Sequence, residues 1–124
     1  MEKFRLVVAG GRDFNDFGLL TKYLDMVLKN AKGRSEIVIV TGKARGADAL
    51  GEKYALLRGF TIQEHAADWD KHGKSAGYKR NEVMAKNSDA TVAFWDGKSK
   101  GTEHMINLTR KYGNKLKVFK YGQD

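Results

Sequence analysis

The sequence predicts an α/β fold in which helices cover both faces of a parallel five-stranded sheet. Three observations lead to this prediction. Five short apolar runs alternate with four helical patterns along 124 residues, and such alternation is typical of βαβ units. The first two runs are apolar without a break, as in strands buried on both faces. Glycines follow several of the runs, where strands are expected to end.

The five expected strands are short and rich in β-branched and aromatic residues. They are Phe4–Ala9, Ile37–Thr41, Phe60–His65, Ala90–Trp95 and Leu116–Tyr121. With right-handed crossovers, the expected strand order is 3-2-1-4-5. This is a Rossmann-like three-layer sandwich, in which a ligand binds beyond the carboxyl ends of the strands where the order reverses. That point lies between the first and fourth strands.

About four helices are expected between the strands, because apolar residues recur there at spacings of three and four. The expected core positions are Phe17, Leu20, Leu24, Val27 or Leu28 and Ala31; Ala47, Leu50, Tyr54 and Leu57; Val83 and Met84; and Met105, Leu108 and Tyr112. The third helix, over residues 76–87, is the most polar of the four. Gly59 and Gly113 are placed to end the second and fourth helices.

Length and composition favour one domain over residues 1–124. The absence of cysteine excludes disulfides and thiol chemistry, and with three scattered histidines we expect no metal site. No cofactor is expected. We expect a cytoplasmic protein, because no signal segment and no membrane span are visible. The net charge of +8 favours an anionic partner, either nucleic acid or a phosphorylated small molecule. The sequence does not decide between a monomer and a homo-oligomer.

The loops after the first two strands combine glycines with charged side chains. The first loop lacks the dinucleotide fingerprint G-x-G-x-x-G, but its glycines permit close approach of a ligand. It reads Gly10-Gly11-Arg12-Asp13. The second loop leads into a helix, whose start attracts anions. It reads Gly42-Lys43-Ala44-Arg45-Gly46-Ala47-Asp48. Asp48 belongs either to the ligand site or to the first helical turn alone.

The third loop carries Asp68, Trp69 and Asp70. Trp69 either stacks on a base or plugs the edge of the sheet. Arg80 and Asn81 follow in the next helix, where a guanidinium suits a phosphate.

The fourth loop contains the strongest anion-site signal, because glycines, hydroxyl residues and a helix start coincide at the expected point of strand reversal. It reads Asp96-Gly97-Lys98-Ser99-Lys100-Gly101-Thr102. Thr102 is alternatively a plain helix N-cap, which would leave other N–H groups free.

Nine of the 23 basic residues lie in or beside these four loops, and five acids lie with them. The basic residues are Arg12, Lys43, Arg45, Lys71, Lys74, Lys79, Arg80, Lys98 and Lys100, and the acids are Asp13, Asp48, Asp68, Asp70 and Asp96. This mixture favours a shaped pocket for phosphate and hydroxyl groups over a smooth nucleic-acid track.

Four ordered motifs resemble the YspA-like branch of the SLOG superfamily. The motifs are GGRDF, TGKARGAD, ADWDKHGKSAGYKRNEVM and FWDGKSKGT, which together cover nearly the whole chain. That superfamily also holds the LOG-type phosphoribohydrolases and the DNA-processing protein A. The resemblance implies a Rossmannoid fold and the binding of nucleotide-derived ligands, including relatives of ADP-ribose.

The sequence departs from the related patterns at three positions. Gly97, Gly101, Thr102 and Arg80 match the LOG-type pattern, but its catalytic glutamate falls on Met105, while Asp96 and Glu103 are out of register. Methionine cannot stabilise an oxocarbenium-like transition state. Lys43 stands where the branch pattern predicts glycine, and Tyr78 stands where it predicts proline.

We therefore expect a binding module or sensor for a phosphate-bearing, nucleotide-derived small molecule. One alternative is an enzyme that cleaves an N-glycosidic bond with Arg80 and a carboxylate such as Asp96. Another is single-stranded nucleic-acid binding, with Trp69 and Trp95 as stacking groups, although Trp95 ends a strand and is expected in the core. The expected ligand-binding residues are Gly10, Gly11, Arg12, Asp13, Gly42, Lys43, Arg45, Gly46, Asp48, Asp68, Trp69, Arg80, Asn81, Asp96, Gly97, Lys98, Ser99, Gly101 and Thr102.

Overall fold

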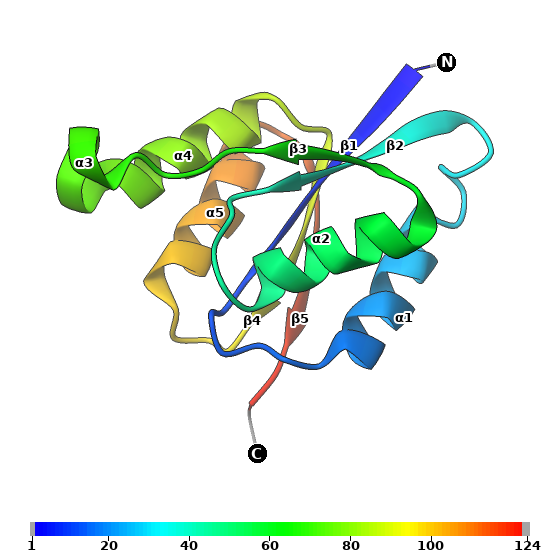
Figure 1. The fold of residues 1–124 in the computed structure, drawn as a ribbon, viewed down its shortest axis with the longest axis horizontal. Helices are drawn as coiled ribbons and strands as arrows, with labels where there is room; N and C mark the ends of the chain where they lie inside the picture. Colours follow the sequence, from blue (N-terminus) through cyan, green and yellow to red (C-terminus); the bar gives the residue numbers. More distant parts are fainter. Residues whose placement is uncertain (1, 123–124) are drawn as a thin grey trace.

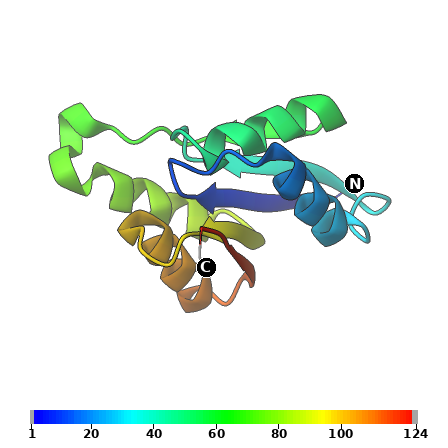
Figure 2. The ribbon, with the colours of Figure 1, turned by 90° about the horizontal axis from the view of Figure 1, so that it is seen from below.

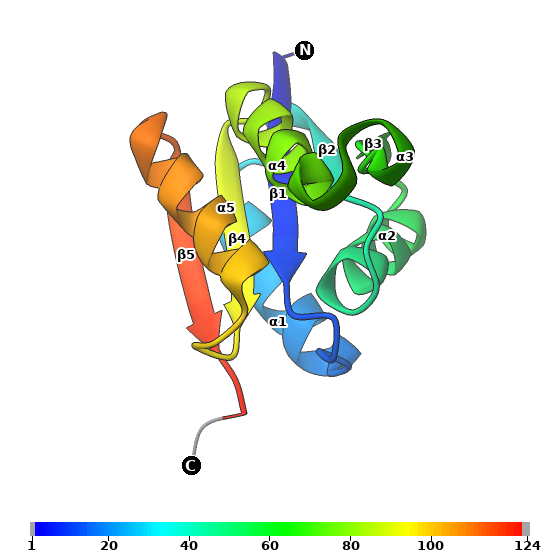
Figure 3. The same cartoon turned by 90° about the vertical axis from the view of Figure 1, so that its left-hand side faces the viewer.

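A computed structural model describes residues 2–122 and shows the predicted sheet, with five parallel strands in the order β3-β2-β1-β4-β5. The strands are β1 (Glu2–Gly10), β2 (Ser35–Thr41), β3 (Thr61–Glu64), β4 (Ala90–Trp95) and β5 (Lys115–Lys120). Their ends lie within two residues of the predicted ones. Strand β1 is central between β2 and β4, so the reversal of strand order falls where predicted (Figure 3).

Four long helices cover the two faces of this sheet, which gives the three layers seen in Figure 2. Helices α1 (Phe17–Leu28) and α2 (Ala47–Arg58) pack on one face, and α4 (Ala76–Lys86) and α5 (Lys100–Lys111) on the other. No helix within residues 2–122 is long and apolar enough to cross a membrane.

Two short elements that we did not predict lie ahead of α4 (Figure 1): helix α3 (Trp69–His72) and the 3₁₀ turn η1 (Gly73–Ser75). The carboxylate of Asp68 accepts the N–H of Lys71 at 3.1 Å and so caps α3. The hydroxyl of Ser75 donates to the carbonyl of His72 at 2.9 Å. These short bonds give the segment before α4 a defined conformation.

The core divides into two clusters because successive side chains of a strand point to opposite faces. Leu6 and Val8 of β1 pack with α1 and α2, while Val7 and Ala9 pack with α4 and α5. Most of the predicted helical core residues are buried, and Leu28 rather than Val27 completes the buried stripe of α1.

Two predicted core residues are wrong. Leu57 is 64% exposed, because the buried stripe of α2 runs through Gly51, Tyr54 and Ala55. Val83 is 44% exposed, although its neighbour Met84 is buried. On both helices the buried face is narrower than the apolar pattern indicated, and small residues occupy part of it.

Candidate functional site

A cavity of about 380 Å³ lies at the carboxyl ends of β1 and β4, next to the starts of α2 and α5. Its volume falls within the range of roughly 300–1,000 Å³ that is usual for small-molecule sites. The predicted residues that line it are Gly10, Gly11, Arg12, Asp13, Asp48, Arg80, Asn81, Asp96, Ser99, Gly101 and Thr102. The parallel topology therefore brings together residues from all four chain segments that carry the motifs.

Two smaller cavities adjoin the central one at Arg12 and Arg80, which line all three. The second cavity, of about 240 Å³, is formed with the loop after β2 and includes Gly42, Lys43 and Arg45. The third, of about 210 Å³, lies against the start of α4. Trp69 lines both smaller cavities. The two arginines thus lie where the three cavities meet.

Arg80 is held in place by the loop after β2 and by its neighbour in α4. Its Nη1 donates to the carbonyl of Gly42 at 2.7 Å, and its Nε donates to Oδ1 of Asn81 at 3.1 Å. Asn81 is buried and donates through Nδ2 to the carbonyl of Gly101 at 3.3 Å. Burial lowers the pKa of Arg80, an effect that Asp48 opposes and Arg12 increases. The guanidinium stays charged, because its ordinary pKa lies far above neutrality.

Asp48 is a carboxylate that lines the central cavity while its residue is only 6% exposed. It lies in the first turn of α2, and its Oδ2 accepts the N–H of Ala44 at 3.3 Å. Burial raises the pKa of Asp48 to about 6, against the opposing effects of that hydrogen bond and of Arg80. Asp48 therefore lies both in the first turn of α2 and in the wall of the central cavity.

Gly46 allows α2 to begin directly against the loop that follows β1. Its φ of 74° and ψ of −125° are tolerated by glycine alone. A Cβ at this position would lie 2.7 Å from Cα of Arg12 and would overlap the carbonyl of Gly11. The N–H of Ala47 donates to that same carbonyl at 3.2 Å. Gly46 is thus placed behind the wall of the cavity and does not line it.

The loop after β4 uses its own side chains to bind N–H groups that we expected to be free for an anion. Oδ1 of Asp96 accepts the N–H groups of Ser99 and Lys98, each at 2.8 Å, and these bonds lower the pKa of Asp96. Oγ of Ser99 accepts the N–H of Thr102 at 3.4 Å, so the N-cap of α5 is Ser99 and the alternative that assigned it to Thr102 is wrong. Asp96 therefore stabilises the conformation of this loop, and it also lines the central cavity.

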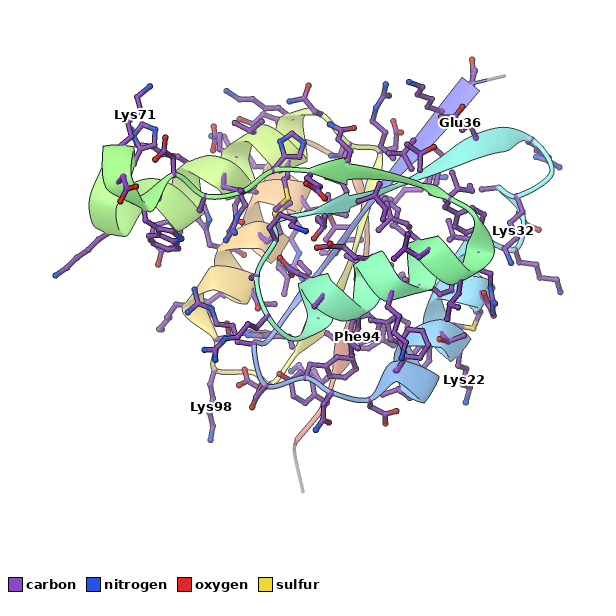
Figure 4. The ribbon with its side chains drawn as sticks, in the orientation of Figure 1. Lys22, Lys32, Glu36, Lys71, Phe94 and Lys98 are labelled. Atoms are coloured by element: carbon purple, nitrogen blue, oxygen red, sulfur yellow. The ribbon has the colours of Figure 1, made fainter. Side chains whose placement is uncertain are left out.

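Several expected site residues do not line these three cavities. Asp68 caps α3, and Gly97 has a φ of 84° in the turn before α5. The side chains of Lys71 and Lys98 point outward from the molecule in Figure 4. Fewer of the nine basic side chains predicted to surround the site therefore line the three cavities.

Lys43 has the only left-handed backbone among the non-glycine residues at positions 2–122, with a φ of 61°. This agrees with the glycine that the branch pattern predicts there. Its Nζ pairs with Glu52 at 2.7 Å and with Glu64 at 3.4 Å. The ammonium group thus has two carboxylate partners, neither of which lines one of the three cavities.

The sequence did not indicate the role of Tyr121, which follows β5 and lies over the loop after β1. Its hydroxyl donates to Oδ1 of Asp13 at 2.6 Å, and a Cβ on Gly11 would overlap that hydroxyl. Burial, and then Asp13, raise the pKa of Tyr121. Trp95 is half-buried, and its Nε1 donates to the carbonyl of Ser99 at 3.1 Å. No short sequence motif predicts either of these two contacts.

The strand order, and the cavity at the point where this order reverses, define a Rossmann-like α/β domain. The chain belongs to the YspA, cpYpsA-related SLOG family, whose sequence model matches residues 4–72. It is 34% identical over 125 residues to the Gene 61 protein of Mycobacterium phage D29, and the match covers 95% of this chain and 96% of that protein.

Two solved structures of DNA processing protein A share the fold. The Helicobacter pylori protein, described for its single-stranded DNA binding mode, is 21% identical with a TM-score of 0.68 over 93% of this chain. The Streptococcus pneumoniae protein is 17% identical with a TM-score of 0.70 over 94% of this chain. The chain spans 64% and 50% of the lengths of these two structures.

Proposed function

We propose that this protein binds a phosphate-bearing, nucleotide-derived small molecule at the carboxyl ends of β1, β2 and β4. The observation that carries the proposal is the pair Arg12 and Arg80 at the junction of three cavities. Within the described part of the chain, neither arginine forms an ion pair. A phosphate or diphosphate between them would receive charge-assisted hydrogen bonds, the stronger kind.

The acids around these arginines favour a ligand that also carries hydroxyl groups. Asp48 and Asp13 both line the central cavity. A carboxylate accepts hydrogen bonds from sugar hydroxyls and repels phosphate, so it suits the sugar part of a nucleotide. Nucleotides linked to ribose, such as relatives of ADP-ribose, contain both kinds of group. Membership of the SLOG family supports this class of ligand.

Calorimetric titration with ADP and ADP-ribose tests the proposal. We expect Arg12→Ala to weaken binding at least tenfold, which is about 1.4 kcal/mol. Arg34→Ala is the matched control, because Arg34 is also exposed and lies in the turn before β2, at the amino ends of the strands and away from the cavities. Equal affinity of the two variants, or no binding of either nucleotide to the wild type, would overturn the proposal.

A second candidate function is single-stranded nucleic-acid binding. Trp69 favours it, because this side chain is 51% exposed beside the two arginines and could stack on a base. The shared fold with a protein described as binding single-stranded DNA points the same way. An oligothymidylate that binds far more tightly than any mononucleotide, with a steep dependence on salt, would favour this function.

The N-glycosidic cleavage alternative has weaker support. Asp96 is committed to two backbone hydrogen bonds, and Met105 lines the central cavity where a catalytic glutamate is expected from the LOG-type pattern. The buried carboxylate of this cavity is therefore Asp48, which is not the carboxylate named for cleavage in this alternative.

A further inference from the structure

The third cavity has a different character from the central one, because two large aromatic side chains line it. Trp69 is 51% exposed and Tyr78 is 48% exposed, and both border a space of about 210 Å³ together with Arg12 and Arg80. This volume is below the usual size of a site for a whole small molecule, so it suits one part of a ligand.

Each of the two aromatic rings contacts other residues: Trp69 lies close to α4 at Gly77, and Tyr78 packs on His104. A Cβ added to Gly77 would lie 3.4 Å from Cη2 of Trp69 and 3.5 Å from Nη2 of Arg80, so the missing side chain leaves the indole and the guanidinium close to the first turn of α4. The ring of Tyr78 packs on the ring of His104, with centroids 4.4 Å apart and an interplanar angle of 58°. The cap of α3 by Asp68 fixes the residue that precedes Trp69.

We propose that the third cavity binds the nucleobase of the ligand against Trp69 and Tyr78, while its phosphate binds at Arg12 and Arg80. This subsite rests on the proposed function. The shared border of the cavities at the two arginines supports it, because a nucleotide needs a flat apolar surface within one sugar of its phosphate. Stacking on aromatic rings suits any base, since every base has a π-face.

The polar groups of this cavity have little capacity left to distinguish one base from another. The amide of Asn81 accepts from Arg80 and donates to Gly101, and it also contacts Nδ1 of His104 at 3.3 Å. Lys74 supplies a flexible ammonium group. Base identity therefore changes affinity only slightly, and purine nucleotides bind a few-fold more tightly than pyrimidine nucleotides through their larger rings.

Titration of AMP and of ribose 5-phosphate separates the base from the phosphate. The wild type is expected to bind AMP at least tenfold more tightly than ribose 5-phosphate. Trp69→Ala reduces this preference to less than threefold, because AMP loses far more affinity than ribose 5-phosphate does. Trp69→Phe retains most of the preference, because it keeps an aromatic face. Arg12→Ala weakens both ligands and retains the preference.

Three results would count against the subsite in different ways. If the wild type binds both ligands equally, or if Trp69→Ala weakens both equally, the nucleobase subsite is wrong and the phosphate site stands. If neither ligand binds to the wild type, the proposed function fails together with the subsite. An oligothymidylate and TMP, titrated in parallel into wild type and Trp69→Ala, show whether the stacked base comes from a single strand or from a free nucleotide.

Discussion

Replacing Asp48 with asparagine is expected to stabilise the ligand-free protein at neutral pH. Asparagine keeps the shape of the side chain and can still accept the N–H of Ala44, but it carries no charge. The folded protein raises the pKa of Asp48 from 3.8 to about 6, so it binds the proton more tightly than the unfolded chain does. The associated stability is complete below the unfolded pKa and is lost as the pH rises through about 6.

The magnitude follows from the same two pKa values. At roughly 1.4 kcal/mol per pKa unit, a rise from 3.8 to about 6 corresponds to about 3 kcal/mol of lost stability. Because the residue is only 6% exposed, solvent screening removes little of this effect. The free energy of unfolding of Asp48→Asn, relative to wild type, should therefore increase by up to about 3 kcal/mol between about pH 4 and about pH 8.

Urea unfolding of both proteins at the two pH values measures this difference, and the other titrating groups cancel in the comparison. Asp25→Asn is the control, because Arg58 lowers the pKa of Asp25 from 3.8 to about 2, so that this carboxyl titrates below the measured range. The stability of that variant relative to wild type should therefore change little between the two pH values. A pH-independent difference for Asp48→Asn, or a loss of stability at the higher pH, would refute the reasoning.

Three further predictions concern single positions. Lys43→Gly should be more stable than Lys43→Ala by about 1 kcal/mol in urea unfolding, because both lose the ion pairs and only glycine relieves the left-handed backbone; equal stability would contradict this. Ser99→Asp should keep the fold, since aspartate also caps helices. Its negative charge should weaken binding of a nucleoside diphosphate at least tenfold, or about 1.4 kcal/mol. The neutral Ser99→Asn is its control, and equal affinities of the two variants would count against a phosphate near this cap. No appreciable hydrolysis of AMP is expected with Met105 in the cavity; steady release of adenine that Arg80→Ala abolishes would show otherwise.

The strand order could be predicted because its signals are local and repeated. Alternation of apolar runs with helical stripes defines βαβ units, and the handedness of their crossovers leaves few arrangements. Side-chain burial was harder where a helix packs through small residues. Leu57 and Val83 continue apolar patterns, but Gly51 and Ala85 occupy the buried positions nearby.

Which chain segments line the candidate site could be predicted from the sequence, but the contacts of individual side chains there could not. Arg12 and Arg80 come together because the loop after β1 and the first half of α4 both lie at the carboxyl ends of the strands. The loop after β4 shows the limit, because its sequence signals an anion site while Asp96 already satisfies two of its donors. The contact between Tyr121 and Asp13 joins residues 108 positions apart, and a sequence pattern cannot express such a pair.

The position of Tyr121 also bears on how the protein is handled at the bench. Its hydroxyl donates to Asp13 in the loop that carries Arg12, so a purification tag or fluorophore attached after this residue would lie close to the central cavity. The start of β1 lies at the opposite end of the parallel sheet from the end of β5, as Figure 1 shows. Labels for titration or for immobilisation on a sensor surface therefore belong at the amino end.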